Sequence, residues 1–381
     1  MTPEGSIRTV APMTTYDTTA EPDIDEQATE AFAGRLFEVF TGAVLSDLID
    51  IGQRTGLFDA ATAGAATSTE LAARAGLTER YVREWLAAMA TARVFEYDAV
   101  SRRFWLPREH AACLTGTGVG NLAPVARLTT MLGNHVTAVA DAFRRGGGVP
   151  YDAFVPEIHE VMDALWQPMY ETLLVPAILP LASGLTERLT AGIRVADVAC
   201  GTGNGLLVLA REFPASRFVG YDLDGRAIES ARGRAEQRGL RNVSFERLDA
   251  AELVVDEPFD AILVFNAIHD QADPAQVVRR IHDALAPGGQ FLMDEPCASS
   301  NLEDAIGSPL APFTYAVSTL HCMTVSLASG GAGLGTAWAQ DVATQMLRDA
   351  GFGTVEVHDA PGDPGNAVFV TTKPTSTGQE A

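Results

Sequence analysis

The C-terminal half of this sequence predicts an α/β fold built on an open, doubly wound and mostly parallel sheet. From Arg194 onward, strand-like and helix-like segments alternate through five repeats and a final hairpin-like pair. The first strand-like run, residues 195–199, is apolar in the way of a strand buried on both faces. A glycine-rich turn follows it, at the end of the strand where such sheets bind ligands. The N-terminal half has helical periodicity instead.

Length and composition favour a protein of two or three domains with a sizeable core. The 381 residues are 47% apolar and 20% charged, and we expect a soluble protein. No apolar run is long enough for a transmembrane helix, and the N-terminus lacks the pattern of a signal peptide. The cysteines are far apart and form no C-x-x-C motif, which predicts free thiols in a reducing cytoplasm.

The charge pattern narrows the classes of function. The net charge is −22, so the chain repels phosphate backbones and nucleic acid is not the partner we expect by default. Lys373 is the only lysine and lies near the C-terminus. Schiff-base chemistry, pyridoxal-phosphate chemistry and a phosphate-binding P-loop are therefore excluded.

Residues 67–98 and the following residues 102–107 predict a compact N-terminal module. Ser68 or Thr69 can cap a short helix, and Thr78 opens a second one before a β-hairpin. This order resembles a winged helix. One interpretation is DNA binding through Arg80 and Arg83 of the second helix. The other is a packing module, which the acids interleaved with those arginines favour.

Two helical stretches flank this module. From Ala31 an apolar face recurs at helical spacing up to Leu48, and residues 154–181 form another helical region that leads into the first strand of the sheet. Most apolar residues of the second region are core. Trp166, Met169 and Tyr170 are candidates for the roof of a substrate pocket.

The turn VADVACGTGNG, residues 195–205, carries the first functional motif. A dinucleotide-binding fingerprint would need a small residue at position 206, where this chain has Leu206. The pattern is instead an acid followed four residues later by G-x-G-x-G. It resembles motif I of the class I S-adenosyl-L-methionine (SAM) methyltransferases, and the residues concerned are Asp197, Gly201, Gly203 and Gly205.

Polar residues follow each of the next strands, and together with motif I they predict a SAM site. Asp222 can accept two hydrogen bonds from ribose hydroxyls, with Leu223 beside it, whereas Asp224 is the better helix cap. The resemblance implies that Asp249 faces the adenine amino group. It also places Ala250 beside the adenine and Asn266 at the methionine portion.

The segment FNAIHDQADP after the fourth strand predicts the catalytic site. A histidine of ordinary pKa can take a phenol or enol proton at neutral pH, and His269 follows that strand. Over residues 31–373 the chain resembles small-molecule O-methyltransferases of plants and actinobacteria. The resemblance implies that His269 is the general base and that Glu295 flanks it. The Leu-His-Asp-Trp motif of those O-methyltransferases differs in this chain, which has Gln271 in place of the tryptophan. Asp270 is a further candidate, although it or Asp273 can simply cap the next helix.

A second interpretation of the same residues involves iron. His269, Asp270 and His321 can form a two-histidine, one-carboxylate face, which resembles an iron-dependent bacterial C-methyltransferase of an aromatic 2-keto acid. Otherwise His321 lines the substrate pocket without a metal.

We therefore expect a Rossmann-like, seven-stranded methyltransferase domain behind a winged helix. The resemblance also implies a homodimer formed through the N-terminal domain. The predicted reaction is methyl transfer to a hydroxyl or enol carbon of a small aromatic or natural-product acceptor. A SAM-binding transcriptional regulator and a different SAM-dependent reaction stay open as alternatives.

The predicted parts are a disordered tail (1–28), a winged-helix-like dimerisation domain (29–115), a helical connector and substrate roof (116–185), the SAM-binding domain (186–374) with a substrate lid (296–340), and a second tail (375–381).

Overall fold

The computed structural model describes residues 24–299, 301–336 and 338–375. The chain divides into two compact units, residues 1–44 and 45–381. Helix α1 (Glu26–Arg54) begins earlier than the expected end of the first tail at residue 28. The reason is a cap that the sequence analysis overlooked: Asp25 accepts a hydrogen bond from the Ala28 backbone N–H. Most of the two predicted tails lies outside the described residues.

The predicted helix, turn, helix and hairpin are confirmed within the second unit. They are α3 (Ser68–Ala75), α4 (Glu79–Thr91), and the antiparallel strands β1 (Glu96–Asp98) and β2 (Arg103–Trp105). A short helix that was not predicted, α2 (Leu57–Ala61), precedes them. The cap of α3 is Thr67, not Ser68 or Thr69. Its hydroxyl accepts from the Glu70 N–H while the Glu70 carboxylate accepts from the Thr67 N–H, and this reciprocal pair fixes the start of the helix.

The arginines considered for DNA binding are both paired with acids of their own helix. The guanidinium of Arg80 lies 2.5 Å from Glu84, and that of Arg83 lies 2.9 Å from Glu79. Each pair spans one helical turn, where opposite charges attract. These contacts favour the packing interpretation of the winged helix.

The connector is helical, as predicted. Its elements are α6 (Ala123–Gly133), α7 (Val136–Arg145), η1 (Tyr151–Ala153), α8 (Glu157–Met169), the π-helix η2 (Tyr170–Ile178) and η3 (Leu179–Leu181). Before it, α5 (Arg108–Leu114) belongs to the predicted winged-helix part, and after it α9 (Leu185–Ala191) begins at the end of the predicted connector. Among the described residues, no single helix is both long and apolar enough to cross a membrane. Only the bent pair 157–181 and 185–191 meets those criteria when taken together. Leu174 and Ile178 of that pair are buried in the core.

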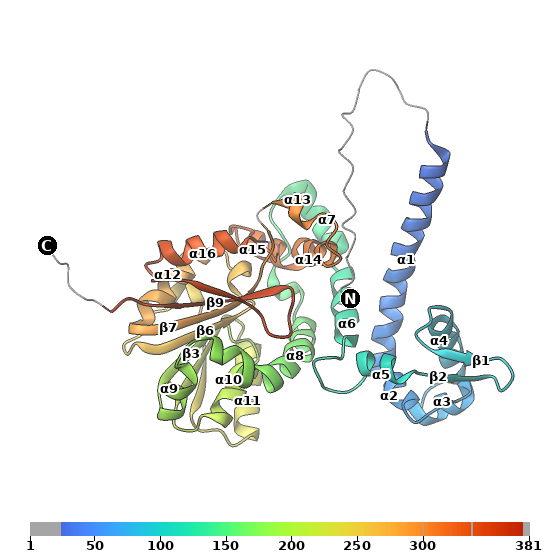
Figure 1. The fold of residues 1–381 in the computed structure, drawn as a ribbon, viewed down its shortest axis with the longest axis horizontal. Helices are drawn as coiled ribbons and strands as arrows, with labels where there is room; N and C mark the ends of the chain where they lie inside the picture. The colour runs from blue at the N-terminus through green and yellow to red at the C-terminus, as the bar shows by residue number, and fades with distance from the viewer. Residues whose placement is uncertain (1–23, 300, 337, 376–381) are drawn as a thin grey trace, which may run out of the picture. The chain divides into compact units, whose positions relative to one another are not determined.

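The C-terminal domain contains a seven-stranded sheet in the order β5-β4-β3-β6-β7-β9-β8 (Figure 1). Its strands are β3 (Arg194–Val198), β4 (Arg217–Asp222), β5 (Val243–Arg247), β6 (Phe259–Phe265), β7 (Leu285–Pro296), β8 (Glu356–Asp359) and β9 (Asn366–Thr372). The first five of this spatial order are parallel, whereas β9 is antiparallel to both of its neighbours. The predicted Rossmann-like, seven-stranded sheet is confirmed.

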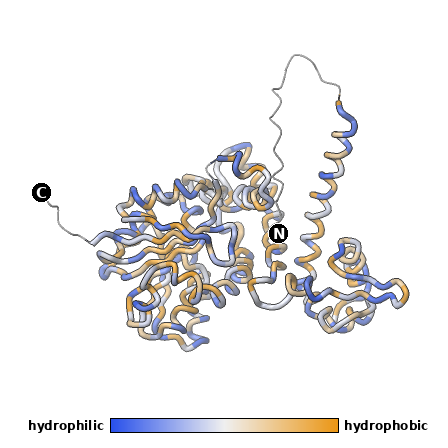
Figure 2. The backbone as a smooth tube through the Cα atoms, in the orientation of Figure 1, coloured by the Kyte–Doolittle hydropathy of each residue, from blue (hydrophilic) through white to orange (hydrophobic). Residues whose placement is uncertain are grey.

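Helices cover both faces of this sheet. α9, α10 (Asn204–Glu212) and α11 (Gly225–Gln237) share one core cluster with it, and α12 (Pro274–Ala284) and α16 (Gln340–Asp349) share the other. The two helix layers lie on opposite sides of the strands in Figure 1. The strands between them are mostly hydrophobic along their length (Figure 2), as burial on both faces requires.

The predicted lid, residues 296–340, is an insertion between β7 and α16. It contains α13 (Leu302–Ala305), α14 (Ala311–Val317), the π-helix η6 (Ser318–Cys322) and α15 (Met323–Ala328). Its centre is buried, and the Thr324 hydroxyl accepts a hydrogen bond from the Val149 N–H of the connector. The insertion is therefore packed on the rest of the unit, and a role as a lid stays a prediction.

Candidate active site

The polar residues predicted for the site lie in a row along one edge of the sheet. Because five neighbouring strands run parallel, their carboxyl ends meet at the same edge. In spatial order from β5 to β7, that edge carries Asp249, Asp222, Asp197, Asn266 and Glu295.

The glycine turn between β3 and α10 has the backbone that its sequence requires. Gly201 and Gly203 have φ of +53° and +80°, which side chains other than hydrogen rarely allow. A Cβ on Gly203 would lie 2.6 Å from the Phe245 ring. Gly205 does not have positive φ, and a Cβ there would meet Asp197 Oδ2 at 3.8 Å. The first two glycines thus shape the turn.

Asp222 is held by the glycine turn that it faces. One carboxylate oxygen accepts from the Gly201 N–H and the other from the Asp224 N–H, each at 2.8 Å. Asp224 caps α11 through the Arg226 N–H, as predicted. Each carboxylate oxygen has a second lone pair, so Asp222 can still accept from ribose hydroxyls. Burial raises the pKa of Asp222, and the two N–H donors oppose that rise.

Asp197 is the buried acid behind the glycine turn. It is 3% exposed, and its Oδ1 finds no hydrogen-bond partner within the described part of the chain. Burial, and then the charge of Asp222, raise its pKa well above the ordinary value. A buried polar atom without a partner is uncommon in proteins, so the site fits a ligand that brings a donor or a positive charge.

The remaining predicted cofactor residues occupy turns at the same edge. Asp249 caps the short helix η4 (Ala250–Glu252) by accepting from the Ala251 N–H at 2.9 Å, and Ala250 is buried. Asn266 has φ of +53°, and its side-chain oxygen accepts from Asn366 at 2.9 Å. Leu223 is 60% exposed. Contact of these residues with SAM stays a prediction.

A polar network that the sequence analysis missed joins the connector to the glycine turn. Asp163 of α8 accepts hydrogen bonds from Thr202 and Asn204, and Arg234 of α11 pairs with the same carboxylate. Thr202 and Asn204 are 7% and 8% exposed. The only local signal was the polar character of these two residues between the glycines. The roof helix is thereby fastened directly to the predicted cofactor loop.

The predicted roof residues lie beside this network. Trp166 and Met169 are half-buried at the end of α8, and Tyr170 begins η2. The Tyr170 ring packs edge-on against Phe265, the last residue of β6, with 5.2 Å between ring centroids. These contacts place the roof over the end of β6, and its contact with an acceptor stays a prediction.

The predicted base and its flanking acid form a direct contact. His269, in the turn η5 (Ile268–Asp270), places Nδ1 2.5 Å from Glu295 Oε2. Glu295 is fully buried, and its other oxygen accepts from the N–H groups of Ala267 and Ile268 at 2.7 Å. A carboxylate in this position makes Nδ1 the protonated nitrogen, which leaves the Nε2 lone pair for chemistry.

The expectation of an ordinary pKa for His269 is wrong. Burial alone would lower the pKa of the imidazole, but the charges of Asp270 and Glu295 outweigh it and raise the pKa well above its usual value. Nε2 lies 3.1 Å from Asp270 Oδ1. Alkaline pH or a positive charge bound close by would therefore favour the neutral, basic imidazole.

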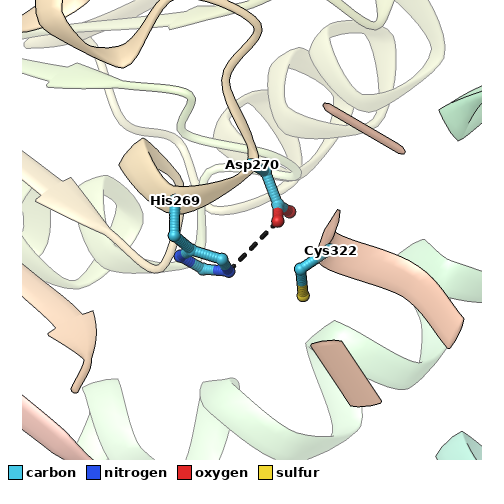
Figure 3. Close-up of side chains that lie close together, drawn as sticks. All are labelled: His269, Asp270 and Cys322. Carbon is cyan, nitrogen blue, oxygen red and sulfur yellow. Dashed lines mark ion pairs between the residues drawn. The ribbon is translucent and has the colours of Figure 1, made fainter. Parts of the chain in front are cut away.

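The group around His269 differs from the predicted iron set. Among the described residues, the ligand atoms that lie within 4.8 Å of one another belong to His269, Asp270 and Cys322 (Figure 3). His321 is not a member. Its ring packs against Phe154 at 4.7 Å and Tyr151 at 6.1 Å, and its Nδ1 lies 3.5 Å from Cys322 Sγ at the border of the group.

The structure also decides whether Asp270 or Asp273 caps the helix that follows η5. Asp273 accepts from the Gln276 N–H at 2.8 Å and caps α12. Asp270 is therefore not the cap of that helix, and its carboxylate faces His269.

Matches to family models agree with this architecture. Residues 43–116 match the model described as an Rv2258c-like winged HTH domain, and residues 189–351 match the model described as a methyltransferase domain. The chain thus combines a winged helix with a methyltransferase domain of Rossmann-like fold.

Curated relatives match parts of the chain. Methyltransferase GfsG of Streptomyces halstedii is 32% identical over 178 residues, which cover 43% of this chain and 62% of the relative. Trans-aconitate 2-methyltransferase of Streptomyces coelicolor is 36% identical over 110 residues, 27% of this chain and 34% of the relative. The chain therefore spans less than two thirds of the length of either protein.

Solved structures match nearly the whole chain. The mitomycin 7-O-methyltransferase MmcR has a TM-score of 0.68 at 18% identity and covers 91% of this chain and 100% of its own. Human N-acetylserotonin methyltransferase, solved with SAM, has a TM-score of 0.66 at 17% identity, with coverage of 93% and 100%. At these identities the likeness is one of fold, and it matches the fold that the resemblance implied.

Proposed function

We propose that the protein is a SAM-dependent methyltransferase that methylates a hydroxyl of a small aromatic or natural-product acceptor. The observation that carries this proposal is the contact between His269 and Glu295 at the same sheet edge as the glycine turn and Asp222. A nucleoside held by Asp222 and Asp249 would extend along that edge toward His269. The methyltransferase relatives support the choice of reaction.

The chain's own residues supply orientation and proton transfer. SAM, when bound, supplies a methyl group on a positively charged sulfur, so that the demethylated cofactor leaves as a neutral thioether, which is a good leaving group. His269 Nε2 accepts the proton of the acceptor hydroxyl as the oxygen–carbon bond forms and the carbon–sulfur bond breaks. Glu295 holds the imidazole in the required tautomer and stabilises its positive charge. Trp166, Met169 and Tyr170 would exclude water from above.

Labelled methyl transfer tests the proposed function directly. The full chain is incubated with SAM carrying a labelled methyl group and with a panel of phenols, enols and 2-keto acids. We expect label in the ether product of at least one phenol or enol, with the demethylated cofactor formed in equal amount. SAM binding without transfer to any member would contradict this acceptor class, and absence of SAM binding would contradict the proposal as a whole.

Two alternatives are less well supported. The iron scheme requires His321 as a ligand, but the group of ligand atoms within 4.8 Å of one another contains Cys322 and not His321, whose ring packs on Phe154. The regulator requires arginines free to contact DNA, but Arg80 and Arg83 are paired with acids. A gel shift that weakens with rising salt would favour the regulator.

We also propose that the protein is a homodimer formed through α1. The first half of this helix exposes large apolar side chains at helical spacing, including Phe37 at 73% and Phe40 at 58% exposure. A helix of this kind is stabilised mainly by packing of its apolar face. A second copy of the chain is the partner we propose for it.

Light scattering after size exclusion tests the dimer. The wild-type chain is expected to have the mass of two chains, and a double variant with Phe37→Glu and Phe40→Glu is expected to be monomeric, because charges would be buried in the interface. Glu38→Gln, on the same helix, is the matched control and should stay dimeric. A monomeric wild-type chain would rule this proposal out.

A further inference from the structure

The group around the proposed base also has the composition of a cation site. His269 Nε2, Asp270 Oδ1 and Cys322 Sγ form what we call the His–Asp–Cys cluster, and Figure 3 shows the three side chains facing one another. We propose that this cluster binds a thiophilic divalent cation such as Zn²⁺, and that the bound cation inhibits methyl transfer by occupying Nε2. The inhibitory part of this inference rests on the proposed role of His269 as the base.

The imidazole nitrogen and the aspartate oxygen of the cluster are spaced nearly as in a tetrahedral site. The ligand atoms all lie within 4.8 Å of one another, and Nε2 and Oδ1 are 3.1 Å apart. Two ligand atoms at ordinary zinc bond lengths in a tetrahedron are separated by roughly 3.3 Å. The histidine and the aspartate are thus already placed, and the Cys322 thiol lies within 4.8 Å of both as the third ligand.

The orientation of His269 matches that of a metal ligand. A histidine that ligates a metal usually donates its other N–H to a carboxylate, which fixes the tautomer and the ring plane. Here Nδ1 contacts Glu295, which is itself held by backbone N–H groups. The lone pair of Nε2 is therefore directed at Asp270 and Cys322 by a buried support.

The cluster has unmet polar capacity. Asp270 Oδ1 has no hydrogen-bond partner with adequate geometry within the described residues, and the same is true of Nε2 of the neighbouring His321, which is 7% exposed. Two carboxylates and a thiol surround a single imidazole, so the site favours a positive charge. Nitrogen, oxygen and sulfur ligands together suit zinc and related ions, and sulfur disfavours Mg²⁺ and Ca²⁺.

The local helix geometry explains how Cys322 enters the cluster. It lies at the end of the π-helix η6, in the insertion between β7 and α16. π-helical turns are rare and occur often at functional sites. Burial raises the pKa of the Cys322 thiol to about 12. A coordinated thiol loses its proton, so cation binding would release one proton from this residue.

Cobalt absorption tests binding without knowledge of the acceptor. Metal-free full-length protein is titrated with Co²⁺, and a thiolate-to-cobalt band is expected to saturate at about one equivalent per chain and to disappear on addition of Zn²⁺. Cys322→Ser should abolish the band, and Asp270→Asn should weaken Co²⁺ binding. Cys113→Ser, which removes an exposed cysteine, is the control and should retain the thiolate-to-cobalt band. No band in the wild-type chain, or an equal band in Cys322→Ser, would overturn the inference.

Zn²⁺ inhibition tests the consequence for catalysis. The ratio of methyl transfer with and without Zn²⁺ is measured for each variant, so that differences in basal activity cancel. We expect the wild-type rate to fall about tenfold or more, to recover with a chelator, and to fall less in Cys322→Ser. A Cys322-dependent rise in rate would overturn both the inhibition and the role of His269 as base. If no transfer occurs under any condition, the proposed function fails while the cobalt titration still decides the site.

Discussion

Replacing His269 with alanine is expected to lower kcat by roughly two or more orders of magnitude while SAM binding is retained. At this edge of the described sheet, the structure gives the imidazole of His269 a buried supporting carboxylate at Nδ1, while its Nε2 faces Asp270 at 3.1 Å. Without the imidazole, the proposed base for the proton of the acceptor hydroxyl is missing. We expect SAM still to bind, because the acids that we propose for the nucleoside, Asp222 and Asp249, follow other strands.

The measurement combines kinetics with calorimetry. Turnover is followed with labelled SAM, and the dissociation constant of the demethylated cofactor is measured for the same preparation. Glu295→Gln is expected to reduce kcat as well, since an amide oxygen can accept from Nδ1–H but stabilises the imidazolium less. His358→Ala, which changes a partly exposed histidine in β8, is the control. Turnover of His269→Ala at the wild-type rate would refute the assignment.

Replacing Asp222 with alanine is expected to weaken SAM binding by one to several orders of magnitude. A hydrogen bond to a charged group contributes about 1.5–3 kcal/mol, which corresponds to roughly 10- to 150-fold in affinity, and the carboxylate is placed to accept two from a ribose. The same carboxylate holds the Gly201 N–H, so the glycine turn would also loosen in the variant.

Calorimetry with SAM and with its demethylated product checks this expectation. Asp222→Asn is expected to lie between the wild type and the alanine variant, because the amide keeps one acceptor oxygen. Asp256→Asn, an exposed acid before β6, is the control for loss of one negative charge. Thermal melting of each variant separates lost binding from lost folding. Unchanged affinity for SAM in Asp222→Ala would show that Asp222 does not bind the ribose.

Several features of the site were predictable because they depend on local pattern. The alternation of apolar runs and helical segments predicts a doubly wound, mostly parallel sheet, and parallel strands bring their carboxyl ends to one edge. Residues at those ends, such as Asp222 and Asn266, then lie at the same edge whatever the details of packing, here on strands separated by β3. Gly203 is similar, because a positive φ and a close ring leave room for glycine alone.

Other features depend on contacts between segments that are far apart in the sequence. Asp163 meets Thr202 and Arg234 only because α8 packs against α10 and α11. Cys322 stands in place of His321 in the group beside the proposed base, although both residues lie in the π-helical turn η6. No pattern within either segment carries that information.

The sequence by itself therefore determined the class of sheet, the row of acids at its edge and the pairing of His269 with Glu295 across neighbouring strands. Only the tertiary structure decided the charge state favoured by His269 and the identity of the third side chain beside it. The physical reason is range. The presence of strands and the conformation of turns follow from local periodicity and sterics, whereas strand order, a pKa and a ligand set follow from contacts that only the folded chain brings together.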